Sequence, residues 1–192
     1  MKILLVVATK SEIIEEKFKT CDVIVTGVGM INTTFSLTKR LSKRSYDLVI
    51  NMGVAGSFSD DIKIGDVVEV IEDNFPEIGF EDGESFLEFT NLRVKNSFKV
   101  GEKTNLKKVK GVTVNTVHGN EKKISEVIGR LSSDIESMEG AACFMVCEQF
   151  ETPCIQIRAI SNKIEKRNKE NWNLPLAISN LNTEVEKIIN SL

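Results

Sequence analysis

Two charged residues, Glu139 and Arg158, stand in segments whose other residues are typical of a protein core. Glu139 opens the small-residue run 139–142 (EGAA), and Arg158 lies within the apolar run 154–160 (CIQIRAI). An unpaired charge in the interior is costly, so each of these charges needs a partner there. A carboxylate held beside a buried arginine therefore predicts a site that binds a polar ligand.

Further polar and glycine residues follow runs that have the composition of buried strands. Glu12 comes shortly after the apolar run 2–8, Asn162 ends the last such run, and the glycine turns 27–29 and 53–56 each follow another. Ligands bind at the carboxyl ends of strands in α/β sheets, and glycines let the backbone approach a ligand. Each feature also has a structural explanation, because helix dipoles favour Glu at helix starts and turns favour Gly and Asn.

The single histidine and the cysteines give no sign of metal chemistry. His118 stands at a predicted strand-to-helix junction without a Ser/Asp or metal partner, so a structural role is favoured. Cys143 and Cys147 lie four residues apart in an apolar helical run and are predicted to be packing residues. The spacing of the four cysteines matches no metal-binding pattern, so neither a metal ion nor a cofactor is predicted.

Strand-like and helix-like segments alternate along the chain. Strands are predicted at residues 2–8, 22–26, 48–51, 66–72, 112–117, 135–138 and 153–161, and helices at 10–18, 33–41, 120–131, 140–150 and 174–192. Asn32 is predicted to cap the second helix. The alternation predicts one α/β domain over residues 1–192, a three-layer sandwich with a mixed, mostly parallel central sheet. The irregular segment 73–110 is predicted to be an insertion or flap over a site.

Composition limits the partners and the compartment. The chain has 192 residues, 41% of them hydrophobic, which suits one domain with a full core. Its net charge of −3 gives no electrostatic case for nucleic acid or an anionic membrane. No apolar run approaches the ~18 residues of a membrane span. Unpaired thiols and the lack of an export signal predict a cytoplasmic location.

The order and approximate spacing of the two glycine turns and the charged residues resemble the purine nucleoside phosphorylase and nucleosidase superfamily. The resemblance covers most of the chain and implies a nucleoside phosphorylase-like fold. It implies that Glu12 activates water, that Glu139 binds the ribose hydroxyls, and that Met138 packs on the sugar. It further implies that Arg158 helps to hold the water and that Asn162 addresses the imidazole edge of a purine.

The same resemblance completes the expected site and its assembly. Gly53, Val54 and Ser161 are expected to join the substrate-binding residues. The ligand is expected to be a small purine nucleoside, and the assembly a homodimer or a larger homo-oligomer. An aromatic residue that stacks on adenine in methylthioadenosine nucleosidases is replaced here by Glu121 or Lys122, which leaves the base-stacking partner unassigned.

Within the superfamily, the chain is similar to the futalosine hydrolases of the alternative menaquinone pathway. The similarity rests on the segments 75–83 (FPEIGFEDG), 117–120 (VHGN), 158–168 (RAISNKIEKRN) and 172–178 (WNLPLAI). Methylthioadenosine nucleosidases have Asp where Asn162 stands. An asparagine oxygen can accept from a protonated purine N7 while its amide donates to O6 of hypoxanthine. The resemblance and this pairing therefore predict hydrolysis of futalosine with release of hypoxanthine.

Three alternatives remain open at this point. A methylthioadenosine/adenosylhomocysteine nucleosidase would act on an adenine nucleoside. A purine nucleoside phosphorylase would need a phosphate site, usually with Arg at the glycine turns, and neither turn has Arg or Lys near its glycines. A non-catalytic nucleoside-binding protein would be expected to lose Glu12 or Glu139, and this chain has both.

Overall fold

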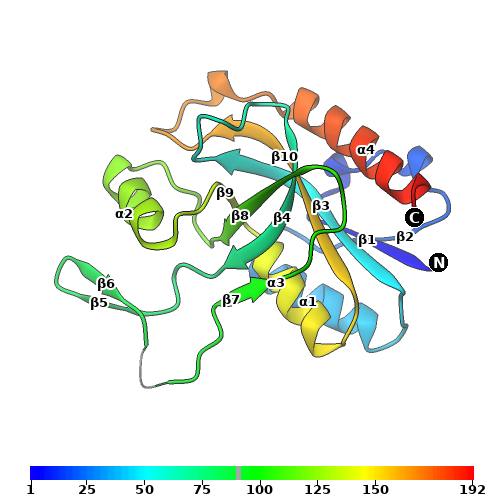
Figure 1. The fold of residues 1–192 in the computed structure, drawn as a ribbon, viewed down its shortest axis with the longest axis horizontal. Coiled ribbons are helices and arrows are strands. Elements are labelled where there is room, and N and C mark those ends of the chain that lie inside the picture. The colour runs from blue at the N-terminus through cyan, green and yellow to red at the C-terminus, as the bar shows by residue number, and fades with distance from the viewer. Residues whose placement is uncertain (90–91) are drawn as a thin grey trace.

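The fold is built on one large mixed sheet, seen in a computed structural model that describes residues 1–89 and 92–192 (Figure 1). The strands of this sheet are β1 (Ile3–Val7), β2 (Asp22–Val25), β3 (Leu48–Ser57), β4 (Val67–Asn74), β7 (Ser97–Lys99), β8 (Lys107–Thr113), β9 (Ile135–Ser137) and β10 (Cys154–Lys163). The helices are α1 (Met30–Leu41), α2 (Glu121–Leu131), α3 (Gly140–Gln149) and α4 (Leu174–Asn190). Strands β5 (Phe80–Asp82) and β6 (Ser85–Leu87) form a separate hairpin.

The sheet is mostly parallel and closes on itself at one end. Five strand pairings are parallel and three are antiparallel, which confirms the predicted mixed sheet. Strand β3 pairs with β1 along its first half and with β9 at Gly56 and Ser57. Because β10 also joins β3 to β4, the strands β3, β10, β4, β8 and β9 complete a ring.

Helices cover both faces of the sheet, as the three-layer prediction requires. Leu4 and Val6 of β1 pack with α1 and α3, whereas Ile3, Leu5 and Val7 pack with α4. Figure 1 shows α4 on one side of the sheet and α1 and α3 on the other. Burial on both faces explains why β1 is a continuous apolar run instead of an alternating one.

Two predicted elements differ from the structure near the first strands. Residues 10–18 form the short 3-10 turns Lys10–Glu12 and Glu15–Lys17 instead of an α-helix. The Asn182 side chain of α4 accepts from Ile14 N and donates to Glu12 O, so tertiary hydrogen bonds replace helical ones there. Helix α1 begins at Met30 with Gly29 as its N-cap, and Asn32 instead donates to Val28 O.

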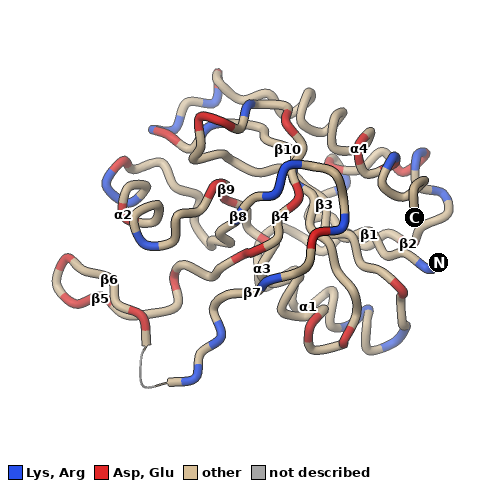
Figure 2. The backbone as a smooth tube through the Cα atoms, in the orientation of Figure 1, with Lys and Arg blue, Asp and Glu red and all other residues tan. Residues whose placement is uncertain are grey.

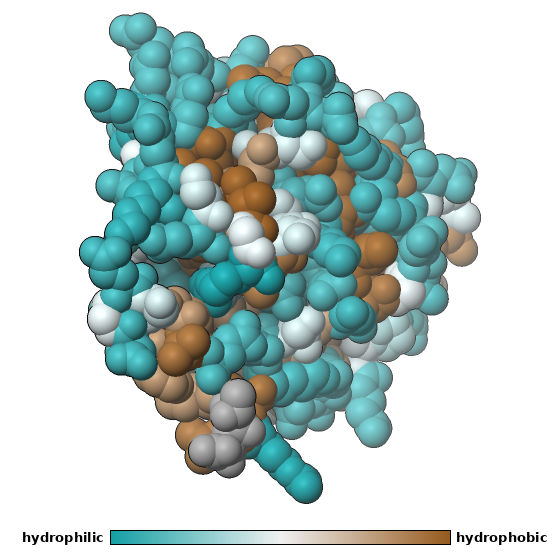
Figure 3. Space-filling model, turned by 60° about the vertical axis from the view of Figure 1, so that its left-hand side comes forward, coloured by the Kyte–Doolittle hydropathy of each residue, from teal (hydrophilic) through white to brown (hydrophobic). Residues whose placement is uncertain are grey.

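The segment 73–110 is more regular than predicted. It contains the end of β4, the β5–β6 hairpin, β7 and the start of β8, so β8 lies earlier than the predicted strand 112–117. The hairpin projects from the sheet in Figure 1, and Figure 3 shows brown, apolar atoms among the teal, hydrophilic ones on the face that it draws. Residues 90 and 91 lie outside the described residues. That this segment covers a site remains a prediction.

Charge is spread over the chain. Figure 2 shows Lys and Arg interspersed with Asp and Glu, in keeping with the net charge of −3. In the part of the chain that the structure describes, no helix is both long enough and apolar enough to span a bilayer.

Candidate active site

The carboxylate of Glu12 is buried and held from two sides. Glu12 ends the 3-10 turn that follows β1 and is only 6% exposed. Its Oε2 accepts from Thr9 N at 2.8 Å and from Thr9 Oγ1 at 3.2 Å. Its Oε1 accepts from Val54 N at 3.3 Å. These donors compensate the buried negative charge and fix its position. The predicted turn 53–56 was wrong, because these residues continue strand β3 and pair with β10.

Glu139 connects α3 to the first glycine turn. It is the N-cap residue of α3 and is 6% exposed. Its Oε1 accepts from Gly29 N at 3.0 Å, and Gly29 has a φ of 94°, a conformation that glycine adopts readily. The predicted position of Glu139 at a helix start is confirmed. The structure also shows why the distant turn 27–29 belongs to the same site.

Arg158 lies between the two carboxylates and is 1% exposed. Its Nη1 is 3.9 Å from Glu139 Oε2. Its Nε donates to Gln156 Oε1 at 3.0 Å, two residues earlier on the same face of β10, and its Nη2 donates to Asn51 Oδ1 at 2.6 Å. Two of the three guanidinium nitrogens are therefore committed to neutral partners, and Nη1 faces the carboxylate.

Asp73 extends this network and was not predicted as part of it. Its Oδ2 accepts from Gln156 Nε2 and its Oδ1 from Thr113 Oγ1, both at 2.9 Å. Burial raises the pKa of the Asp73 carboxyl to about 6, against the opposing effect of those two hydrogen bonds. Gly140 is required next to it, because a Cβ there would overlap Gln156 Oε1 and Asp73 Oδ2. The signal available in the sequence was weak, since Asp73 only follows the predicted strand 66–72.

Asn162 lies near the end of β10, where this strand has a bulge. The register between β10 and β3 shifts between Ile160 and Asn162, and a bulge of this kind re-aims side chains. Asn162 Nδ2 donates to Lys163 O at 2.8 Å, and Ser161 Oγ donates to Asn162 Oδ1 at 2.8 Å. A carbonyl oxygen only accepts, so the Asn162 amide has one orientation, with its oxygen turned away from Lys163 O.

A small cavity adjoins Asn162. Gly56, His118, Glu136 and Trp172 are among the residues that line it. The Arg167 guanidinium lies over the Trp172 ring at 5.1 Å. Glu121 and Lys122, which stand where an adenine-stacking aromatic was expected, are exposed residues of the first turn of α2. Trp172 and His118 are thus the aromatic residues beside Asn162.

His118 has a buried partner that sequence reasoning missed. Its backbone N–H donates to Glu136 Oε1 at 2.9 Å, and its ring nitrogen Nδ1 is hydrogen-bonded to Glu136 Oε2. Glu136 is a buried charged residue in β9, two positions before Met138. The signal available in the sequence was a Glu within a short run that otherwise has a strand composition.

The remaining predicted binding residues fall into two groups. Gly53 and Val54 lie with Glu12 and Arg158, and Ser161 lies with Asn162. Met138 is half-buried next to Glu139, and its contact with a sugar remains a prediction.

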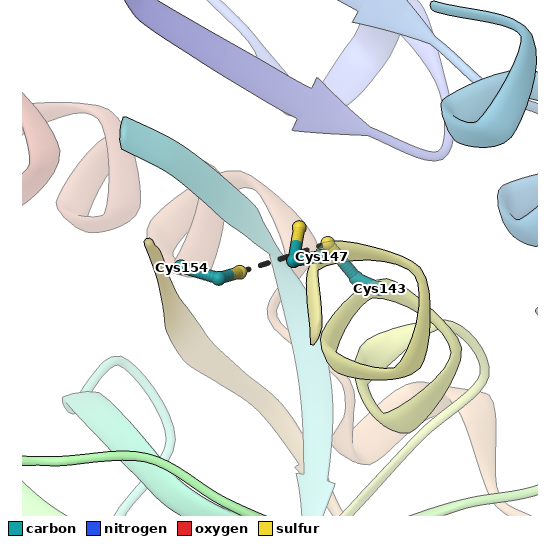
Figure 4. Close-up of side chains that lie close together, drawn as sticks. All are labelled: Cys143, Cys147 and Cys154. Atoms are coloured by element: carbon teal, nitrogen blue, oxygen red, sulfur yellow. Dashed lines mark hydrogen bonds between the residues drawn. The ribbon is translucent and has the colours of Figure 1, made fainter. Parts of the chain in front are cut away.

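A third gathering of side chains consists of thiols (Figure 4). The sulfur atoms of Cys143, Cys147 and Cys154 lie within 4.8 Å of one another, and all are free cysteines. Cys143 and Cys147 belong to the apolar cluster between the sheet and α1, as the packing prediction required. Hydrogen bonds among the thiols together with burial raise the pKa of Cys143 and of Cys154. The sequence spacing did not reveal the group, because Cys154 comes from a different element.

The family model of the phosphorylase superfamily matches residues 9–191, and the chain belongs to this superfamily. It is 25% identical over 177 residues to a futalosine hydrolase of Thermus thermophilus, covering 85% of this chain and 79% of that protein. It is 26% identical over 149 residues to an aminodeoxyfutalosine nucleosidase of Campylobacter jejuni, covering 71% of this chain and 65% of that protein.

A solved structure supports the fold over the whole chain. A 5'-methylthioadenosine/S-adenosylhomocysteine nucleosidase from Helicobacter pylori, crystallised with butyl-thio-DADMe-Immucillin-A, superposes with a TM-score of 0.88. The match covers 100% of this chain and 99% of that one at 17% identity. The α/β fold with a mixed sheet is therefore confirmed.

Proposed function

We propose that this protein hydrolyses the N-glycosidic bond of a purine nucleoside, and that the nucleoside is futalosine. The products are then hypoxanthine and dehypoxanthine futalosine, an intermediate of the alternative menaquinone pathway. The observation that carries this proposal is the convergence of two buried carboxylates, Glu12 and Glu139, on Arg158. The relatives named futalosine hydrolase and aminodeoxyfutalosine nucleosidase support it.

Glu139 is suited to the ribose. Gly29 N takes one lone pair of its Oε1, and the remaining lone pairs can accept from two sugar hydroxyls. Cleavage of the bond passes through a sugar with oxocarbenium character, which carries positive charge. Two carboxylates and one guanidinium leave the site with excess negative charge, which stabilises that sugar.

Glu12 is suited to the water. Thr9 N and Val54 N hold its carboxylate in one place, so it can take a proton from water that attacks the anomeric carbon. Arg158 Nη1 lies on the same side as Glu12 Oε1, since a methyl group on Gly53 would meet both. Nη1 can therefore hold the oxygen of that water.

Water is a better nucleophile here than phosphate. A phosphate site of a phosphorylase usually has Arg at the glycine loops, and residues 27–29 and 53–56 contain no Arg or Lys. The Nε and Nη2 groups of Arg158 already donate to Gln156 and Asn51. This supports hydrolysis over phosphorolysis.

The orientation of Asn162 supports hypoxanthine as the leaving base. Its oxygen can accept from a protonated N7, and its second N–H can donate to O6. Pairing with adenine would require the amide to flip, which would put Asn162 Oδ1 against Lys163 O, two acceptors. A methylthioadenosine/adenosylhomocysteine nucleosidase is the second candidate, favoured by the similarity to solved structures of that name.

An exposed apolar face on α1 supports the expected homodimer. Ile31 is 77% exposed and Phe35 is 68% exposed, and both line a cavity of about 720 Å³ with Met30, Phe75 and Met145. Exposed apolar surface of this kind is typical of protein interfaces. Light scattering of the wild type and of Phe35→Glu tests the assembly, and we expect the variant to shift toward monomer.

One assay tests the proposed function. The purified protein is incubated with futalosine, inosine, methylthioadenosine and adenosylhomocysteine, each with and without phosphate, and free base and sugar are measured. We expect futalosine to be cleaved fastest, at a rate independent of phosphate, with a free sugar as product. Formation of a sugar 1-phosphate would contradict hydrolysis, and release of adenine alone would favour the second candidate.

A further inference from the structure

A hydrogen-bonded pair, His118 and Glu136, lies apart from the Glu12–Arg158 cluster and beside Asn162. The His118 and Glu136 side chains are 12% and 3% exposed. Both carboxylate oxygens of Glu136 contact His118, one through the backbone N–H and one through the ring nitrogen Nδ1. Two contacts to one residue fix both the position of the backbone and the plane of the imidazole ring.

The Glu136 carboxylate determines which ring nitrogen is available to a ligand. An ionised carboxylate only accepts, so His118 Nδ1 carries a hydrogen and Nε2 is left for another partner. In the imidazolium form Nε2 carries a hydrogen as well. In that form Nε2 is a donor, and the adjacent Glu136 carboxylate balances the charge of the ring.

We infer that His118 contacts the purine base and donates its Nε2–H to the oxygen at position 6, with Glu136 positioning the ring. His118 lines the same small cavity as Asn162, Gly56 and Trp172, and Asn162 is the residue proposed to contact the base. The inference rests on the proposed function of that site. When the glycosidic bond breaks, its electron pair moves into the base, and a charged donor at O6 stabilises the negative charge that develops there.

This contact also selects the base. An oxygen at position 6 accepts from both Asn162 and His118, since it has two lone pairs. An amino group at that position is a donor and opposes both. His118 therefore adds a second discrimination against 6-aminopurines to the one that Asn162 supplies.

Other charged groups surround His118 without bonding to its ring among the described residues. Lys163, Glu165 and Arg167 line the cavity. A second groove that also includes His118 is lined by the charged residues Glu77, Glu81, Glu84, Lys123, Glu126 and Arg130. The Lys163 ammonium pairs with Asp60, and Glu165 accepts from Asn171 Nδ2 at 2.9 Å. Among the described residues, Glu136 is the group that is hydrogen-bonded to the ring.

Two substitutions separate a base contact from a structural role. The amide nitrogen of His118→Asn replaces Nδ1, so this variant keeps the bond to Glu136 and loses the donor at Nε2. The amide nitrogen of His118→Gln replaces Nε2, so this variant keeps the donor toward the base and loses the bond to Glu136. The readouts are kcat/KM for futalosine and its 6-amino analogue between pH 5.5 and about 9, with the melting temperature of each variant.

A base contact predicts that His118→Asn loses on the order of 10- to 100-fold in kcat/KM for futalosine and much less for the amino analogue. His118→Gln should retain more activity than His118→Asn. Glu136→Gln should lower kcat/KM in the same direction as His118→Asn. If His118→Asn instead matches the wild type while His118→Gln is impaired, His118 only anchors its loop and the inference is overturned.

The binding of free hypoxanthine and adenine, measured by calorimetry, tests the base contact separately from the proposed hydrolysis. If the wild type cleaves no nucleoside but binds hypoxanthine in a manner that His118→Asn weakens, the base contact stands and the hydrolase assignment fails. If the wild type cleaves futalosine and His118→Asn binds hypoxanthine as tightly as the wild type, the base contact fails and the hydrolase assignment stands.

Discussion

Gly53 lies directly between Glu12 and Arg158, and the missing side chain is what lets them approach. A Cβ on Gly53 would be 2.9 Å from Glu12 Oε1 and would overlap Arg158 Nη1. Both groups are buried and hydrogen-bonded, so neither can move aside cheaply.

Gly53→Ala should therefore abolish most activity. We expect a loss of roughly 100-fold or more in turnover, because displacing a catalytic group by about 1 Å has that effect. Free-base release measures it. Gly101→Ala is the matched control, since a Cβ at exposed Gly101 meets nothing within 4 Å. Full activity of Gly53→Ala would show that Glu12 and Arg158 do not act together.

Glu12→Gln should reduce turnover by about 100-fold or more while substrate binding is retained, because the base is lost and the shape is kept. One of the donors Thr9 N and Val54 N then faces an amide N–H, which should also lower the free energy of unfolding by about 1–3 kcal/mol. Single-turnover kinetics and substrate binding separate these effects. Turnover close to that of the wild type would move the base elsewhere, with His118 as the next residue to test.

Glu139→Gln should weaken both substrate binding and turnover, because Glu139 is assigned to the ribose hydroxyls. The comparison with Glu12→Gln is informative, since both variants remove one buried charge from the same site. A change confined to turnover would argue against the ribose contact.

Asn162→Asp should shift the preference toward a 6-aminopurine. Asn162 Nδ2 donates to Lys163 O, which is an acceptor. In the Asp variant a protonated carboxyl can donate to Lys163 O or to N7, whereas an ionised carboxylate beside Lys163 O is disfavoured. The wild type should prefer futalosine over its 6-amino analogue by about 5- to 150-fold from this contact. Competition between the two nucleosides gives the ratio directly. Equal cleavage of both by the wild type would refute the role of Asn162 and favour the methylthioadenosine nucleosidase alternative.

Asp73 should make the protein less stable as pH rises from 4 to 6. The pKa of its carboxyl is raised from 3.8 to about 6 in the folded state, so over this range the folded protein keeps a proton that the unfolded chain has lost. Stability from this group is complete below about pH 4 and falls by about 3 kcal/mol by pH 6.5. Urea unfolding of the wild type and Asp73→Asn at several pH values tests this. The difference between the two curves should change with pH, and parallel curves would contradict the assignment.

The sequence predicted which charged residues stand in apolar segments, but not most of the contacts that these and other site residues make. Glu139 and Arg158 were found because a charge in an apolar run is unusual, and the structure brings them together. Asp73 and Glu136 escaped notice because a single acidic residue near a strand end is common. Only the pairing of distant strands puts Asp73 beside Gln156 and Glu136 beside His118.

The layers of the fold followed from apolar periodicity, whereas two local predictions were wrong. Residues 10–18 had helical spacing, but Asn182 from α4 satisfies their backbone instead. The helix expected from Thr33 starts earlier because Gly29 adopts a φ that ends the preceding turn. The closure of the sheet into a ring depends on the length of β3, which the predicted strand 48–51 underestimated.

The clustered thiols make it possible to measure how often α3, the helix whose N-cap is Glu139, opens. Cys143 and Cys147 are 0% and 1% exposed, so an alkylating reagent reaches them only when α3 separates from the sheet. Cys21 is partly exposed and reacts without such an opening, which supplies an internal reference in the same molecule. The alkylation of the peptides that contain Cys143 and Cys147, relative to the peptide that contains Cys21, is followed over time by mass spectrometry. This ratio reports how often α3 separates from the sheet in an otherwise folded protein.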